Sequence, residues 1–89
     1  MNRSDLVPEG IYWRNYTDNA GNNFQSYIFA KIIDNDKLLY RVIKKKGDKY
    51  WMMRTRESSY ENFLNQVERR ITDSSELDMI WGSIRSERL

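Results

Sequence analysis

The spacing of apolar residues changes from two to 3.6 near residue 57, and this change divides the chain into a strand part and a helix part. Residues 10–56 hold aromatic and β-branched runs separated by turn-forming segments, which predicts four strands joined as a meander. Beyond them the apolar positions follow two helical stripes: Tyr60, Phe63, Leu64, Val67 and Ile71, then Leu77, Ile80, Trp81 and Ile84. Strands followed by helices are typical of the α+β class. We therefore predict an α+β fold, a four-stranded antiparallel β-meander that can curl like a small barrel, followed by two C-terminal α-helices.

The 89 residues are predicted to form a single domain, because the chain has no linker long enough to divide it. Its segments are an N-terminal tether, the meander and the two helices: residues 1–9, 10–56, 58–72 and 75–86. Ser58 with Glu61, and Asp73 with Glu76, have the three-residue spacing of a capping pair. Each pair precedes one of the apolar stripes and marks the start of a helix.

Two predicted turns set a strand register. The hairpin centred on residues 47–48 suits a two-residue turn, because Gly47 can take positive φ. It pairs Lys44 with Trp51, Ile43 with Met52, Val42 with Met53 and Arg41 with Arg54. The preceding turn, centred on Asn35 and Asp36, pairs Phe29 with Val42. Both faces of this sheet carry apolar side chains, so we expect the helices to cover one face and the other to curl or bind a partner.

The sequence contains no cysteine and no histidine. The chain therefore has no disulfide, no thiolate, no usual general base and no copy of the commonest metal ligand. It also has no glycine-rich phosphate loop, nucleophile elbow or metal-spaced cluster. We predict that the protein is not an enzyme, has no catalytic residue and binds no metal or cofactor. A histidine-free ribonuclease that works with arginine, lysine and tyrosine is the enzymatic alternative.

Targeting signals are also missing from the sequence. The amino terminus lacks the apolar core of a signal peptide, and no apolar run approaches the roughly 20 residues that span a bilayer. Together with the absence of cysteine, these features predict a cytoplasmic protein that does not enter a membrane.

Positive charge gathers in the middle of the chain. Residues 23–57 carry nine basic and four acidic side chains, a net charge of +5, whereas the whole chain carries +2. Cations interleaved with aromatic rings on a sheet suit an anionic partner. The candidate binding residues are Arg41, Lys45, Lys46, Lys49, Tyr50, Arg54 and Arg56, with Trp13 and Tyr16 as aromatic anchors. The alternative is that the lysines only protect a sheet edge and that Trp13 belongs to the core.

These features predict a small non-enzymatic binding protein, an inhibitor or adaptor whose partner is a protein with an acidic surface. Two alternatives stay open: binding of RNA or single-stranded DNA by the same basic face, and a structural or oligomerising subunit that uses the C-terminal helix around Trp81. The oligomeric state is left open. In its short, single-domain form and its lack of catalytic groups, the chain resembles the small proteins that phages encode to inhibit host or defence machinery, anti-CRISPR proteins among them. That resemblance implies an anti-defence inhibitor and assigns no site residue.

Overall fold

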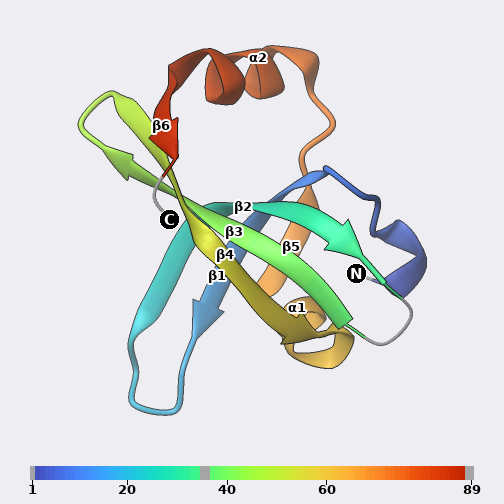
Figure 1. Cartoon of the computed structure of the whole chain (residues 1–89). Coiled ribbons are helices and arrows are strands. Elements are labelled where there is room, and N and C mark those ends of the chain that lie inside the picture. Colours follow the sequence, from blue (N-terminus) through green and yellow to red (C-terminus); the bar gives the residue numbers. More distant parts are fainter. Residues whose placement is uncertain (1, 35–36, 88–89) are drawn as a thin grey trace.

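The computed structural model describes residues 2–34 and 37–87 (Figure 1). Its strands are β1 (Ile11–Thr17), β2 (Asn23–Ile33), β3 (Lys37–Lys46), β4 (Lys49–Ser59), β5 (Val67–Arg70) and β6 (Ile84–Glu87). Its helices are the short 3-10 helix η1 (Arg3–Asp5) and the α-helices α1 (Tyr60–Gln66) and α2 (Ser74–Ser83). Five strands form an antiparallel sheet in the order β5-β1-β2-β3-β4, and β6 adds to the β4 edge in parallel orientation. The predicted α+β class with two C-terminal helices is confirmed.

The prediction of four strands is wrong, because the predicted helix 58–72 ends at Gln66 and the chain continues as β5. Val67 has the extended backbone angles φ −93° and ψ 141°, and its side chain is buried. β5 pairs antiparallel with β1, with Val67 opposite Arg14. A β-branched residue suits a strand, and the edge of β1 supplies partners for the backbone of β5. Among the described residues β5 and β6 do not pair with each other, so the sheet is not closed into a barrel.

Both α-helices begin at a side-chain cap. α1 begins later than predicted, because its cap is Ser59, whose hydroxyl accepts a hydrogen bond from the Asn62 backbone N–H at 3.2 Å. The predicted cap of α2 is confirmed: the Asp73 carboxylate accepts from the Glu76 backbone N–H at 2.9 Å. α2 ends before the predicted residue 86, because the chain turns into β6 and joins the edge of β4.

The predicted register of β3 and β4 is right beside their turn and wrong farther away. Ile43 faces Met52, as predicted. A β-bulge in β4 then shifts the pairing by one residue, so that Arg41 faces Thr55 instead of Arg54. The alternation of side chains along β4 is therefore interrupted once between the turn and the helix.

β2 and β3 show a second irregularity of the same kind. The predicted turn residues Asn35 and Asp36 lie outside the described residues. Past an irregularity in β2, Val42 faces Ile28 rather than the predicted Phe29. Because a shift of one residue exchanges the two faces of a strand, Ile28 shares a face with Val42 and Phe29 points to the opposite side.

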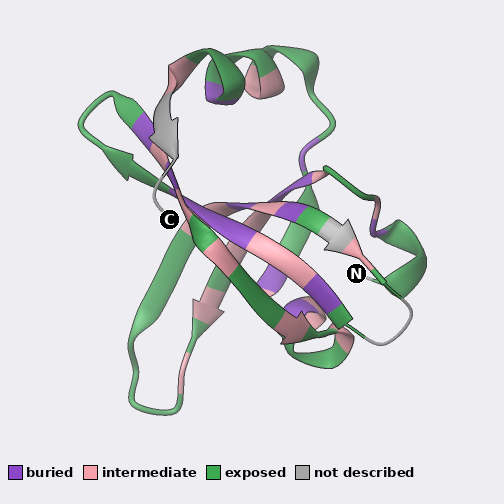
Figure 2. Cartoon of the chain, in the orientation of Figure 1, coloured by how far each residue is buried: buried purple, intermediate pink, exposed green. Residues whose placement is uncertain are grey.

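One helix packs on each face of the sheet, not both on one face as predicted (Figure 1). The core beside α1 consists of Leu6, Tyr12, Ile28, Ala30, Leu38, Phe63 and Val67. The core beside α2 consists of Ile11, Ile43, Tyr50, Met52, Ile71 and Ile80. Both sheet faces carry apolar side chains, so each must be covered, and the buried positions follow the centre of the sheet (Figure 2). β5 runs along the sheet edge between the two helices, and the chain passes there from one face to the other.

The N-terminal segment packs against the sheet. Leu6 is buried, and the Val7 backbone N–H donates to the Tyr12 hydroxyl oxygen at 2.6 Å. The Glu9 backbone N–H donates to the Ala30 carbonyl at 2.7 Å. The described part of the segment predicted as a tether therefore belongs to the folded structure.

Candidate anion-binding site

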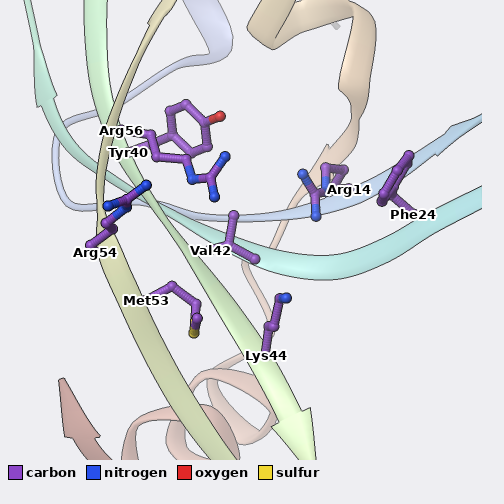
Figure 3. A pocket seen from close by; sticks show the side chains of 8 residues that line it. All are labelled: Arg14, Phe24, Tyr40, Val42, Lys44, Met53, Arg54 and Arg56. Atoms are coloured by element: carbon purple, nitrogen blue, oxygen red, sulfur yellow. The ribbon is translucent and has the colours of Figure 1, made fainter. Parts of the chain in front are cut away.

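A basic pocket with a volume of about 450 Å³ opens on the α1 face of the sheet (Figure 3). β1, β2, β3 and β4 all contribute to its lining, which consists of Arg14, Phe24, Tyr40, Val42, Lys44, Met53, Arg54 and Arg56. We call these eight residues the arginine pocket. Four of them are cations and none is acidic. The ring of Tyr40 contacts the ring of Phe63 with their centroids 5.8 Å apart, so the pocket begins where the cover provided by α1 ends.

The bulge in β4 concentrates the arginines on this face. It leaves Met53 and Arg54 together opposite Val42, whereas regular alternation would send one of the two to each face. Both line the pocket. Arg56 follows two residues later and pairs with Tyr40 across the sheet. The irregular backbone thus turns both guanidinium groups of β4 to the face of Val42, where the cavity lies.

Arg41 supports this bulge from the opposite side. Its side chain is 3% exposed; its Nε donates to the Met53 carbonyl at 2.6 Å and its Nη2 to the Met52 carbonyl at 3.5 Å. A bulge disrupts the ladder of backbone hydrogen bonds locally, and a buried guanidinium supplies donors in its place. The structure therefore places this predicted binding residue inside the protein, where it holds the strand that carries the pocket.

Arg14 is the most enclosed cation of the pocket. Its Nε donates to the Ser26 hydroxyl at 3.2 Å, and its guanidinium carbon lies 5.5 Å from the centre of the Phe24 ring. Burial lowers the pKa of Arg14; the nearby Tyr40 raises it, and the positive charge of Arg56 lowers it further. Among the described residues no carboxylate forms an ion pair with any of the four cations. The pocket therefore holds positive charge without a neutralising group.

A second concavity continues the basic surface towards the β3–β4 turn. It has a volume of about 390 Å³ and is lined by Lys44, Lys45, Lys46, Trp51 and Met53. Lys44 and Met53 also line the arginine pocket. The two concavities are thus neighbours on one cationic surface.

The predicted binding residues fall into separate environments. Arg54 and Arg56 line the arginine pocket, and Lys45 and Lys46 line its neighbour. Tyr16 stacks on Phe24, with the ring centroids 6.1 Å apart and the ring planes at 20°. Lys49 is exposed at the turn; it pairs with Lys46 across the strands but belongs to neither lining.

Trp13 and Tyr50 belong to the opposite face. They pack on either side of Tyr27, at centroid distances of 5.1 Å and 5.9 Å, and Tyr50 is only 6% exposed. The Tyr27 hydroxyl donates to the Glu76 carboxylate at 2.7 Å and ties α2 to the sheet. These aromatic rings therefore pack in or against the core beside α2, and none of them lines the arginine pocket.

The predicted set omits six of the eight lining residues: Arg14, Phe24, Tyr40, Val42, Lys44 and Met53. Arg14 stands two residues from both Tyr12 and Tyr16, and this alternation was a usable sign that it shares their face. Phe24 pairs with Tyr16 across the strands, but only the observed register reveals that pairing. Arg54 and Arg56 share a face because they stand two residues apart, but their position on the face of Val42 depends on the bulge, which no local sequence pattern indicates.

The described residues contain no group of three or more acidic side chains placed to hold a metal ion. None of the helices within residues 2–34 and 37–87 has the length and apolar character needed to cross a membrane. Comparison of the chain with models of known protein families, with curated proteins and with solved structures found no match.

Proposed function

We propose that the protein is a non-enzymatic binding protein, an inhibitor or adaptor, that engages an acidic surface of a protein partner through the arginine pocket. One observation carries the proposal: four cations surround a single cavity, and no acidic side chain lines it. An arrangement of like charges is unfavourable within an isolated domain and becomes favourable when an anionic group enters.

The composition of the pocket suits a protein interface. Arginine, aromatic side chains and methionine are enriched in the centres of such interfaces, and the pocket combines three arginines with Phe24, Tyr40 and Met53. The cavity is also compact, so an acidic side chain of the partner could enter it and be held by guanidinium forks. A cytoplasmic location and the phage-encoded, anti-defence type of inhibitor are part of this proposal. They are supported by the lack of cysteine, the small size and the lack of catalytic groups.

Binding of RNA or single-stranded DNA is the second candidate function. It is favoured by the neighbouring concavity, where three successive lysines lie beside Trp51 and could follow a phosphate backbone. Phe24 offers an aromatic surface that suits either partner. Its ring is 39% exposed, stacks on Tyr16 and lies beside the Arg14 guanidinium.

A salt-dependent titration separates the two functions. A glutamate-rich peptide and a single-stranded oligonucleotide are each titrated into the wild type and into the double variant Arg14→Gln/Arg56→Gln. The double variant Arg69→Gln/Arg70→Gln is the control, because it removes the same charge from β5, outside the pocket lining.

We expect the wild type and the control to bind the peptide, and the pocket variant to bind it about tenfold more weakly or worse. Oligonucleotide binding that exceeds peptide binding and falls steeply with salt would favour the second function. Equal peptide binding by the pocket variant and the control would contradict both functions at this site.

A further inference from the structure

We propose that the arginine pocket receives one phosphoryl group, carried by a phosphorylated side chain of the protein partner. This inference rests on the proposed function, since it names the chemistry of the anion that enters the same site. It follows from the amount of charge around the cavity, from the geometry of the donors and from the apolar residues between them.

The charge around the cavity exceeds what one carboxylate can balance. Arg14, Lys44, Arg54 and Arg56 bring four positive charges to one cavity of about 450 Å³. A carboxylate brings a single negative charge and two acceptor oxygens. A phosphorylated serine, threonine or tyrosine brings about −1.5 to −2 charges near pH 7 and three strong acceptor oxygens. The phosphoryl group is therefore the better match in both charge and number of acceptors.

The donors approach the cavity from different strands. Arg14 comes from β1, Lys44 from β3, and Arg54 and Arg56 from β4, and their side chains are arranged around Val42 (Figure 3). Guanidinium forks can each give two parallel hydrogen bonds to a phosphoryl group, and the lysine adds a point charge. The lowered pKa of Arg14 indicates that its charge is only partly solvated, which leaves it ready to pair with an anion.

Apolar side chains separate the cations. Val42 is buried, Met53 is half-buried, and both line the cavity. Low local polarity strengthens attraction between charges that meet there. The same surface can hold the aliphatic or aromatic stem of the side chain that carries the phosphoryl group. Clusters of arginines are a recurring means of recognising phosphorylated motifs.

Three peptides that differ at one position test the inference. A short alanine-rich peptide carries serine, glutamate or phosphoserine at its centre, and inorganic phosphate is used as a competitor. Affinities are measured by fluorescence anisotropy for the wild type, for Arg14→Gln and for Arg54→Gln. Arg54 is exposed, so its variant remains informative if the half-buried Arg14 proves necessary for folding. Arg69→Gln is the matched control outside the pocket.

We expect the phosphoserine peptide to bind at least about tenfold more tightly than the glutamate peptide, and phosphate to compete with it. Both pocket variants should lose about tenfold or more, and the control should bind like the wild type. Equal affinity for the glutamate and phosphoserine peptides, lost in the pocket variants, would overturn the inference and leave the proposed function intact. Binding that persists in the pocket variants would overturn both.

Two further results would also overturn the inference. The first is no binding of the phosphoserine peptide and no competition by phosphate. The second is an oligonucleotide that binds the pocket more tightly than the phosphoserine peptide does, because the phosphoryl groups would then come from nucleic acid.

Discussion

Arg41 donates a hydrogen bond from its Nε to the carbonyl of Met53 at 2.6 Å, and this bond joins the buried core to the bulge that forms the arginine pocket. The guanidinium lies on one side of the β3–β4 pair, and the pocket opens on the other. A buried cation thus helps to fix the strand shape that turns Arg54 and Arg56 to the face of Val42. The structure of the site depends on a residue that an anion in the pocket does not touch.

The substitution Arg41→Met tests this dependence. It leaves the carbonyls of Met52 and Met53 without their guanidinium donors, so the free energy of unfolding should fall by about 1–3 kcal/mol. Binding of acidic or phosphorylated peptides should weaken as well. Urea unfolding and fluorescence anisotropy measure the two effects. The exposed Lys31→Met, which lies outside both linings, is the control and should change the stability by less than about 0.5 kcal/mol. Unchanged stability in Arg41→Met would refute the supporting role.

Repulsion within the arginine pocket should be visible in the salt dependence of stability. Removing one cation with Arg56→Gln should reduce the gain in stability that salt gives the wild type, by about 0.2–1 kcal/mol between low and physiological salt. Arg69→Gln should instead increase the gain in stability with salt. Arg69 forms an attractive pair with Glu76 at 3.5 Å, and this attraction stabilises the wild type most at low salt. Urea unfolding at several salt concentrations measures both. Identical salt dependence in the two variants would show that the pocket cations do not repel one another.

Tyr27 should make the protein lose stability at alkaline pH. Burial and the hydrogen bond to the Glu76 carboxylate raise its pKa from the ordinary value of 10 to about 12. The neutral phenol is favoured in the folded state, so this stabilisation is complete below pH 10 and is lost as the pH rises towards 12. Tyr27→Phe should therefore show a smaller alkaline loss. Part of the loss should remain, because burial also raises the pKa of Tyr12. Unfolding free energies are measured from pH 8 to 12 for the wild type and for Tyr27→Phe. An equal alkaline loss of stability in both would contradict the role of Tyr27.

Two glycines should respond in opposite directions to the same change. A Cβ at Gly10 would lie 2.9 Å from the Tyr12 hydroxyl oxygen and 2.9 Å from Cγ2 of Val7, so Gly10→Ala should destabilise the fold. The Tyr12 ring is fully buried and cannot easily move aside. Gly82 lies in α2, and beyond the helix's own backbone no atom comes within 4 Å of an added Cβ. Gly82→Ala should therefore raise the free energy of unfolding by about 0.5–1 kcal/mol. Thermal unfolding of the pair provides the test, and a stabilised Gly10→Ala would be inconsistent with the packing of the N-terminal segment.

Trp81 allows a test of the oligomerising alternative. It is 45% exposed and meets Phe29 edge-on, with a centroid distance of 5.5 Å. We expect Trp81→Ala to leave the molecular mass in solution unchanged and to cost far less stability than Phe63→Ala. Phe63 is buried against two tyrosines and should cost about 3–5 kcal/mol. Analytical ultracentrifugation and urea unfolding measure these effects. A smaller mass for a folded Trp81→Ala would instead favour the oligomerising subunit.

Local sequence signals predicted the parts of this fold that depend on neighbouring residues. The α+β class followed from the change in apolar spacing, the pairing of Ile43 with Met52 from the turn at Gly47, and the start of α2 from Asp73. Each of these depends on residues close together in the chain. Such features are the ones that propensity and periodicity describe.

The predictions that were wrong concern features that depend on residues far apart in the chain. Val67 fits a helical stripe, but pairing with β1 makes it a strand residue. The bulge in β4 is stabilised by the Arg41 guanidinium, whose side chain reaches it from the neighbouring strand. One unpredicted residue in the ladder moved Arg54 to the face of Val42 and so changed the composition of the candidate site.

The central claim is that acidic groups bind in the arginine pocket, and nuclear magnetic resonance of the arginine side chains tests it most directly. The Nε–Hε signals are followed while a glutamate-rich peptide, and then a phosphoserine peptide, is added to the wild-type protein. We expect the largest changes at Arg14, Arg54 and Arg56, and little change at Arg69 and Arg70. Changes confined to Arg69 and Arg70, or no change at any arginine at saturating peptide, would contradict the claim.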